Sequence, residues 1–199
     1  MKDFIYADNA ATTRIADEVL EAMMPYFKDN YGNASSVYKF GRDNHQAIES
    51  ARKTIAHLIG ASPMEIFFTS CGSESDNWAL KGTMHRLAAE GKKHLITSKI
   101  EHHAILHSAE ALEREGFDVT YLPVDEYGRV SAQSVKDAIR EDTGLVSIMY
   151  ANNEVGAVQP VRDVCRMARK RGALFHTDAV QATGHLPIDF TRDGFDLLT

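Results

Sequence analysis

An apolar run at residues 174–177 leads directly into a carboxylate, Asp178, which is followed by a carboxamide, Gln181. An aspartate at the end of a buried strand can serve as a turn residue that caps the next segment. Alternatively, a carboxylate at the bottom of a partly dry site can keep a heteroaromatic nitrogen protonated, because an opposite charge favours the charged form of a titratable group. The second interpretation requires further ligand-binding groups at neighbouring strand ends.

A loop of small residues, Ser70–Asn77, follows the first predicted strand and leads into a helix. We predict that Ser73 is the N-cap of this helix and that Asp76, three residues later, forms a near capping box with it. Backbone N–H groups at the positive end of a helix dipole bind phosphate, so the loop is a candidate phosphate site. Neither a Walker loop nor a GxGxxG motif is present, and an ordinary helix start would explain the same residues.

Three histidines, His102, His103 and His107, cluster after the second predicted strand. The i,i+4 spacing of His103 and His107 would suit a metal, but the sequence offers no third ligand at matching spacing and no HExxH motif. We therefore expect no metal site. An imidazole that lies flat against an aromatic ligand is the functional alternative to a set of solvent-exposed histidines.

A later strand is followed by Asn152, Asn153 and Glu154, where a carboxamide can donate to a ligand oxygen or form an Asx-turn. Four strand ends thus supply a phosphate loop, an imidazole, amide donors and an aspartate. Pyridoxal 5'-phosphate (PLP) has a phosphate, an aromatic face, a phenolic oxygen and a ring nitrogen whose protonation makes the ring an electron sink. The four groups fit PLP better than a sugar phosphate or nucleotide, which would leave His102 and Asp178 unexplained.

Short β-rich runs alternate with helical stretches along the middle of the chain. We predict strands at 65–70, 93–98, 117–124, 145–152, 173–178 and 195–199. Apolar residues at helical spacing lie between them, and Gly91, Gly116 and Gly172 stand where those helices should end. The repeated order predicts an α/β fold, with a largely parallel sheet covered by helices on both faces. Ligands of such sheets bind beyond the carboxyl ends of the strands.

Two helices are expected before the sheet, at 16–28 and 41–59. In the second helix the apolar positions should face inward, and Gly60 should end the helix. These apolar positions are Ile48, Ala51, Ile55 and Leu58. We predict an N-terminal arm with packing helices at 1–60 and a large ligand-binding domain at 61–199.

The composition is that of a soluble globular protein, with 44% hydrophobic and 25% charged residues. A net charge of −6 and the lack of a basic run argue against nucleic acid or a membrane surface as a partner. No apolar stretch approaches the ~20 residues that span a bilayer, and the first residues do not resemble a signal peptide. Two cysteines form no disulfide framework, so we expect a cytoplasmic protein.

The sequence resembles the PLP-dependent cysteine desulfurases of the class V aminotransferase family. The matching segments are YADNAATT (6–13), YGNASSVYKFG (31–41), IFFTSCGSESDNWALKG (66–82), HLITSKIEHHAIL (94–106), ANNEVGAVQP (151–160) and HTDAVQATGHLPID (176–189). They run through nearly the whole chain and are specific as a set. The resemblance implies a PLP-dependent transferase of fold type I, with this chain as its N-terminal arm and an incomplete large domain.

The resemblance also implies residue roles around the cofactor. His102 is the expected catalytic residue, an imidazole that stacks on the ring and shuttles protons. Asp178 would pair with the ring nitrogen, and Gln181 would donate to the phenolic oxygen. Gly72 and Ser73 would bind the phosphate.

Asn153 would contact the cofactor and the substrate carboxylate. The implied reaction takes sulfur from L-cysteine, leaves L-alanine and passes a persulfide toward iron–sulfur cluster assembly or thio-modification. A homodimer and a sulfur-acceptor or scaffold protein are the implied partners. Alternatives are a selenocysteine lyase, another enzyme of the class V aminotransferase fold, and a non-catalytic dimerising fragment.

Three departures from the family pattern matter. Ala34 and Tyr38 replace a proline and a histidine, and Cys71 stands where glycine is common. The sequence ends at Thr199, before the expected Schiff-base lysine and nucleophilic cysteine, so we expect the chain alone to be catalytically incomplete and a complementary polypeptide to carry the rest. A strand from that part should lie between the sixth and first predicted strands. Without it, unpaired edges should make the chain alone fold poorly.

No residue of this chain is expected to replace the missing groups. The nearest lysines do not follow the sixth strand and should be solvated; they are Lys81, Lys92, Lys93 and Lys99. Cys165 falls on an apolar helix stripe, and a buried thiol there should be inert.

Overall fold

The computed structural model describes residues 5–199, which divide after Ile66 into two compact units. The first unit contains helix α1 (Asp17–Lys28) and helix α2 (Lys39–Ile59). Both helices begin within two residues of the predicted positions. Helix α2 ends at Gly60 as expected, because the φ of 69° at this residue lies in the left-handed region that favours glycine.

The prediction that the apolar stripe of α2 faces inward is wrong. Ile48, Ile55 and Leu58 expose 40%, 38% and 71% of their surfaces. Ala56 is instead the one apolar side chain that α2 buries, and Asn44 is buried through a hydrogen bond from its Nδ2 to the Gly32 carbonyl (2.6 Å). A unit of two helices has too few elements to enclose a helix on several sides.

The second unit contains a five-stranded sheet in the order β2-β1-β3-β4-β5, and every pair of neighbouring strands is parallel. The strands are β1 (His94–Ser98), β2 (Asp118–Leu122), β3 (Thr143–Ser147), β4 (Leu174–Thr177) and β5 (Leu197–Leu198). Each overlaps a predicted strand, and the predicted α/β fold with a parallel sheet is confirmed. The carboxyl ends of the strands therefore lie at one edge of the sheet.

The predicted strand at 65–70 is wrong. A 3₁₀ turn, Pro63–Glu65, precedes the segment, and the residues that follow form no ladder with any strand of the described chain. Phe67 and Phe68 accordingly expose 65% and 50% of their surfaces. A strand is defined by hydrogen bonds to a neighbour, so a β-rich sequence without a neighbouring strand stays extended and unpaired.

Helices cover both faces of the sheet. They are α4 (Thr83–Ala88), α5 (His103–Arg114), α6 (Ala132–Ala138) and α7 (Val161–Lys170). Leu95 and Leu145 pack with α4 and α5, whereas the next residues, Ile96 and Val146, pack with α6 and α7. This alternation follows from the two-residue period of a strand, and it gives the sheet a core on each side.

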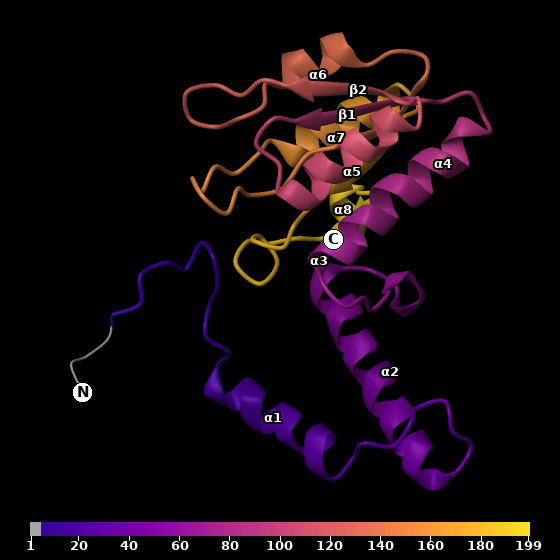
Figure 1. Cartoon of the computed structure of the whole chain (residues 1–199), viewed down its shortest axis with the longest axis vertical. Helices are drawn as coiled ribbons and strands as arrows, with labels where there is room; N and C mark the ends of the chain where they lie inside the picture. The colour runs from indigo at the N-terminus through magenta and orange to yellow at the C-terminus, as the bar shows by residue number, and fades with distance from the viewer. Residues whose placement is uncertain (1–4) are drawn as a thin grey trace. The chain divides into compact units, whose positions relative to one another are not determined.

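The helix ends that the sequence predicted are confirmed. Gly91, Gly116 and Gly172 have φ values of 80°, 89° and 71°, which allow the chain to leave each helix through a left-handed residue. Helix α3 (Gly72–Asn77), a π-helical turn (Trp78–Gly82) and α4 form one helical run, which Figure 1 shows as a continuous segment. A π-helical turn inside a helix is rare and is frequent at functional sites.

None of the helices among residues 5–199 combines the length and the apolar character that crossing a membrane requires.

Candidate functional site

Asp178 lies one residue beyond β4, at the carboxyl edge of the sheet, and exposes 6% of its surface. Its Oδ1 accepts a hydrogen bond from the Val180 N–H (3.0 Å), and its backbone carbonyl accepts one from the Tyr150 N–H (2.7 Å) beyond β3. The Asx-type bond to Val180 shows that Asp178 does serve as a turn residue. The turn and the extension of β3 together fix where the carboxylate lies.

Burial raises the pKa of Asp178, whereas the Val180 N–H and the nearby His102 lower it in part. Within residues 5–199, no lysine or arginine forms an ion pair with this carboxylate. A buried carboxylate without a cation is costly, because burial removes the hydration that stabilises the charge. The site therefore favours a cationic or hydrogen-bond-donating ligand group at Asp178.

His102 is exposed and precedes α5 as its N-cap, with its Nδ1 accepting a hydrogen bond from the Ala104 N–H (3.1 Å). Since Nδ1 is an acceptor, the neutral imidazole carries its proton on Nε2. The capping bond orients the ring and leaves Nε2–H available to a ligand. The sequence identified His102 but gave no indication that it caps a helix.

The predicted N-cap at Ser73 is wrong, because α3 already begins at Gly72 with Cys71 as its N-cap residue. The helix therefore starts two residues earlier than predicted, and the carboxylate of Glu74 accepts a hydrogen bond from the Ser70 N–H (2.6 Å). Gly72 and Ser73 consequently both lie in the first turn of the helix, where backbone N–H groups lack helical acceptors. The loop still presents backbone N–H groups at the start of a helix, and the phosphate-binding role of Gly72 and Ser73 stays a prediction.

Asp76 does not take part in a capping box, contrary to the prediction. Its side chain is buried at 2% exposure and accepts a hydrogen bond from Thr199 Oγ1 (2.6 Å). On the same loop, a Cβ placed on Gly72 would lie 3.2 Å from Val180 Cγ2. The bond to Thr199 connects α3 to the end of β5, and the space beside Gly72 is limited by Val180, which follows β4.

Three buried carboxyl groups, Asp76, Glu101 and Asp178, gather at this edge, and we call them the acid cluster. The pKa of Asp76 is raised to about 7 and that of Glu101 to about 8, mainly by burial; the charge of Asp178 contributes to both shifts, and that of Asp76 contributes to the shift of Glu101. No member is ion-paired with a lysine or arginine within the described part of the chain. Strongly shifted groups in a shared location mark candidate functional sites. A glutamate directly before His102 was the sequence signal that could have identified Glu101.

A buried histidine connects the strands beneath the acid cluster. His176 Nδ1 contacts Ser147 Oγ (2.8 Å), its Nε2 contacts Thr199 Oγ1 (3.2 Å), and Thr199 Oγ1 donates to Asp76. Burial lowers the pKa of His176 to about 3, so the ring is neutral and its 3.9 Å approach to Asp76 Oδ1 is not an ion pair. The sequence gave no indication of this network, because it depends on which strands are neighbours.

Asn153 and Gln181 lie at the same edge without joining the network. Asn152 forms the Asx-turn, since its Oδ1 accepts from the Glu154 and Val155 N–H groups (2.9 Å each). The half-buried Asn153 and the exposed Gln181 make no side-chain hydrogen bond to another described residue. Their amide groups are accordingly available to a ligand, and their predicted roles stay predictions.

The rings of His103 and His107 are stacked, with their centroids 5.4 Å apart. Among residues 5–199, no group of three or more histidine, cysteine, aspartate or glutamate side chains is arranged to hold a metal ion.

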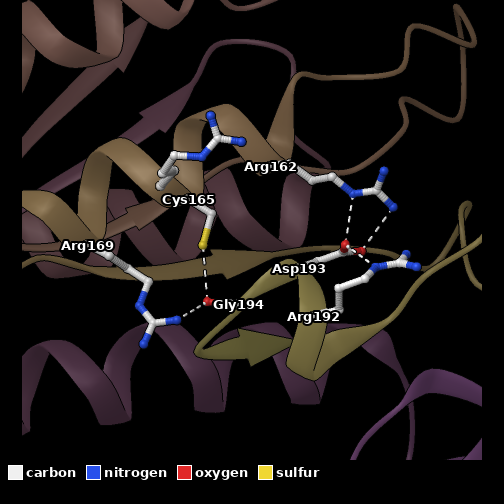
Figure 2. Close-up of a pocket in the computed structure, with 7 residues that line it drawn as sticks. Arg162, Cys165, Arg169, Arg192, Asp193 and Gly194 are labelled. Carbon is white, nitrogen blue, oxygen red and sulfur yellow. Dashed lines mark hydrogen bonds and ion pairs between the residues drawn. The ribbon is translucent and has the colours of Figure 1, made fainter.

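A surface cavity of about 270 Å³ lies elsewhere, between α7 and α8 (Phe190–Asp193). Its lining includes Arg162, Arg166, Arg169 and Arg192, and we call it the arginine cavity. Figure 2 shows that Arg162 and Arg192 both point toward Asp193, with N–O distances of 2.9 and 3.4 Å. No member of the acid cluster lines it. Three of its four arginines pair with carboxylates, whereas no described lysine or arginine pairs with the acid cluster, so we place the candidate site at the acid cluster.

The thiols and lysines are distributed as follows. Cys165 is buried in the wall of the arginine cavity and donates to the Gly194 carbonyl (3.1 Å) (Figure 2). Burial raises its pKa to about 11, so its position is the one predicted, and its low reactivity stays a prediction. Lys93 and Lys99 are exposed as predicted. Lys81 and Lys92 are instead half-buried, because their ammonium groups donate to Asn77 Oδ1 and to the Gly172 carbonyl.

Comparison with known families and proteins gives consistent matches. The family model Aminotransferase class-V matches residues 5–199. The chain is 53% identical to the cysteine desulfurase IscS of Methanosarcina thermophila, over 98% of this chain and 48% of that protein. It is 52% identical to the putative cysteine desulfurase IscS 1 of Bacillus subtilis (strain 168), over 98% of this chain and 51% of that protein.

Solved structures agree with these matches. A NifS-like protein superposes with a TM-score of 0.91 at 43% identity, over 96% of this chain and 53% of that one. The apo cysteine desulfurase of Thermococcus onnurineus NA1 superposes with a TM-score of 0.87 at 28% identity, over 98% of this chain and 49% of that one. The chain spans about half the length of the curated relatives it matches.

Proposed function

We propose, because this chain belongs to the class-V aminotransferase family, that it supplies the cofactor-binding residues of a cysteine desulfurase. The family is PLP-dependent, and the fold is that of the PLP-dependent transferases of fold type I. PLP binding by this chain and the desulfurase reaction are the proposal. The relatives named as cysteine desulfurases support it, although the chain spans about half of each.

The observation that carries the proposal is the buried carboxylate of Asp178, which has no lysine or arginine partner among the described residues. The protonated ring nitrogen of PLP would be that partner. Each charge would then stabilise the other in a partly dry site, because an opposite charge favours the ionised form of both groups. An ordinary turn aspartate needs no burial of this extent, since the hydrogen bond to Val180 forms equally well at a surface.

The remaining residues would position the cofactor and the substrate. Gly72 and Ser73, in the first turn of α3, would hold the phosphate with backbone N–H groups. The oriented imidazole of His102 would stack on the ring and hold or transfer a proton through Nε2. Asn153 and Gln181 would donate to the substrate carboxylate and the phenolic oxygen. When bound, the cofactor supplies an electron sink for bond cleavage at the substrate Cα.

The proposed overall reaction converts L-cysteine into L-alanine and transfers the sulfur as a persulfide toward iron–sulfur cluster assembly or thio-modification. A homodimer and a sulfur-acceptor protein are proposed partners. The names of the relatives, which are cysteine desulfurases, support the removal of sulfur from cysteine, whereas the dimer and the sulfur acceptor rest on the resemblance to the family.

Binding of pyridoxamine 5'-phosphate tests the proposal. This amine form has no aldehyde and so forms no imine with surface lysines. Trp78 is the single tryptophan and begins the π-helical turn after α3, so quenching of its fluorescence would report binding. We expect Asp178→Asn to weaken binding about 10- to 100-fold, since a charge-assisted hydrogen bond is lost.

The control ligand is the carbocyclic analogue of pyridoxamine 5'-phosphate, in which a C–H group replaces the ring nitrogen. The wild-type chain should prefer the natural ring, and Asp178→Asn should abolish that preference. Asp137→Asn is the matched control variant, because it removes the same charge from an exposed position on α6. Equal affinity of the wild-type chain for the two ligands would contradict the proposed function.

A further inference from the structure

The buried carboxyl group of Glu101 has no task in the proposed function. It exposes 5% of its surface and directly precedes His102. Its Oε1 accepts a hydrogen bond from Ser98 Oγ (2.5 Å), and its two oxygens share the Met149 N–H (3.1 and 3.0 Å). One side chain thus connects the end of β1, the turn that carries His102 and the extension of β3.

Two further bonds hold the same turn. Asn152 Nδ2 donates to the Ile100 carbonyl (2.9 Å) from the β3 side, and the Lys99 N–H donates to the Leu122 carbonyl (3.0 Å) at the end of β2. These bonds attach the turn after β1 to β2 and to the extension of β3, which lie on either side of β1. Glu101 makes its bonds at the residue directly before His102, the N-cap residue of α5.

The Met149 extension also leads to Asp178. One residue after Met149, the Tyr150 N–H donates to the Asp178 carbonyl (2.7 Å). Glu101, the residue before His102, and Asp178 are therefore both hydrogen-bonded to one short segment, Met149–Tyr150. The segments that carry His102 and Asp178, the two side chains that would face the cofactor ring, are thus attached to the same part of the fold.

We propose that Glu101 is a positioning residue, which sets the distance between the His102 imidazole and the Asp178 carboxylate so that both meet the same ring. This inference rests on the proposed function. The role requires hydrogen bonds and not charge: no lysine or arginine pairs with Glu101 in the described chain, and burial among Asp76 and Asp178 keeps the carboxyl protonated near neutral pH. A glutamine has the shape and the hydrogen-bonding groups to do the same.

Two probes separate positioning from a general structural role. Inorganic phosphate reports on the loop at Gly72 and Ser73 alone, whereas pyridoxamine 5'-phosphate also requires the ring contacts. In the 199-residue chain we expect Glu101→Leu to lower the affinity for pyridoxamine 5'-phosphate about three- to tenfold, which corresponds to the loss of an aromatic stacking contact. Phosphate affinity should stay within about twofold, and Glu101→Gln should retain both affinities.

A double-mutant cycle tests whether Glu101 acts through His102. The double variant with His102→Ala and Glu101→Leu should bind pyridoxamine 5'-phosphate as tightly as His102→Ala alone. Additive losses, an equal loss of phosphate affinity, or failure of Glu101→Gln to restore binding would each overturn the inference. If Glu101→Leu does not fold, Glu101→Asp is the variant to measure. Its side chain is one methylene shorter, so it should bind pyridoxamine 5'-phosphate more weakly relative to phosphate than the wild-type chain does. An unchanged ratio of the two affinities would overturn the inference.

Failure of the inference is distinguishable from failure of the proposed function. The proposed function fails when the wild-type chain does not distinguish the natural ring from its carbocyclic analogue. The inference fails when that preference is present and depends on Asp178 but is insensitive to Glu101.

Discussion

The acid cluster and the arginine cavity differ in whether their ionisable groups have partners of opposite charge. In the arginine cavity, Arg162 and Arg192 share the carboxylate of Asp193, and the guanidinium groups remain partly exposed to water. In the acid cluster, Asp76 and Asp178 are buried at 2% and 6% exposure without a cation among the described residues. Matched charges at a surface contribute little and need no ligand. Buried carboxyl groups without a cation oppose folding when they ionise, and groups with such raised pKa values cluster at functional sites.

The two regions also differ in how they fit the fold. The arginine cavity lies between two neighbouring helices, α7 and α8. The acid cluster draws its members from α3, from the end of β1 and from the end of β4, segments that are far apart in the sequence. A site assembled from several strand ends is typical of ligand binding in parallel sheets.

The largest expected effect comes from replacing Glu101 in the acid cluster. Its folded pKa of about 8 lies above the ordinary value of 4.5, so its contribution to stability is complete below pH ~4.5 and is lost as the pH rises through 8. Glu101→Gln removes this loss. It should raise the free energy of unfolding by up to about 4 kcal/mol at pH 8 and by less than about 1 kcal/mol at pH 5.

Denaturant unfolding of both chains at several pH values measures this difference. Glu113→Gln on α5 is the control, because that carboxylate is exposed and should show no such trend. A pH-independent effect of Glu101→Gln would mean that the buried carboxyl is not held in its neutral form.

The second prediction compares the two thiols, one in each region. Cys71 is exposed in the candidate phosphate loop, and the backbone N–H of Glu74 lowers its pKa below the ordinary 9.0. Cys165 lies in the arginine cavity with a pKa of about 11. Because the thiolate is the reactive form, iodoacetamide at pH 8 should label Cys71 at least about 100-fold faster.

Peptide mass spectrometry over a time course measures both rates in one sample, and unfolding in denaturant provides the control, since the two rates should then converge. Comparable rates in the folded chain would show that the wall of the arginine cavity opens readily.

A smaller effect is expected for Arg162→Gln, which breaks the ion pair with Asp193. Burial acts to raise the pKa of Asp193, but the hydrogen bond from Arg162 and its other donors hold it below the ordinary value. The loss should be about 1 kcal/mol, since Arg162 is half-exposed and solvent screens the pair. A lowered folded pKa means that this stability is present at neutral pH and is lost as the pH falls below ~4.

Unfolding experiments at pH 7 and pH 3 test the sign, which is opposite to that of Glu101. A loss that persists in full at pH 3 would indicate that Arg162 acts by packing and not by charge.

The smallest effect is expected for Arg166→Gln. This exposed residue forms an i,i+3 pair with Asp163 on α7 at 3.3 Å. Such pairs contribute roughly 0.2–0.5 kcal/mol and weaken with salt. A loss above 1 kcal/mol in thermal melts, or one unaffected by 1 M sodium chloride, would contradict the view that this region holds ordinary surface pairs.

Local patterns in the sequence predicted the sheet well and its first strand poorly. Alternating apolar runs and helix-ending glycines such as Gly116 depend on neighbouring residues alone, so they were interpreted correctly. Whether residues 65–70 form a strand depends on a neighbouring strand, which no local pattern specifies. The apolar stripe of α2 failed for the same reason, because burial requires an element to pack against.

The residues of the candidate site also divide into those that a local pattern identifies and those that only non-local contacts identify. Residues with distinctive chemistry at strand ends, His102 and Asp178, were identified from the sequence. Glu101 and His176 were not, because their importance arises from contacts with β3 and with Thr199, which lie up to 48 residues away along the chain. Asp76 was assigned to a capping box because its burial could not be foreseen.

The protonation state of the bound ring tests the central claim most directly. Pyridoxamine 5'-phosphate labelled with ¹⁵N at the ring nitrogen, bound to the chain at a pH where the free ring nitrogen is neutral, should give the ¹⁵N chemical shift of a pyridinium in the wild-type chain and of a neutral pyridine in Asp178→Asn. A neutral nitrogen in the wild-type chain, or the same shift in both proteins, would contradict the account.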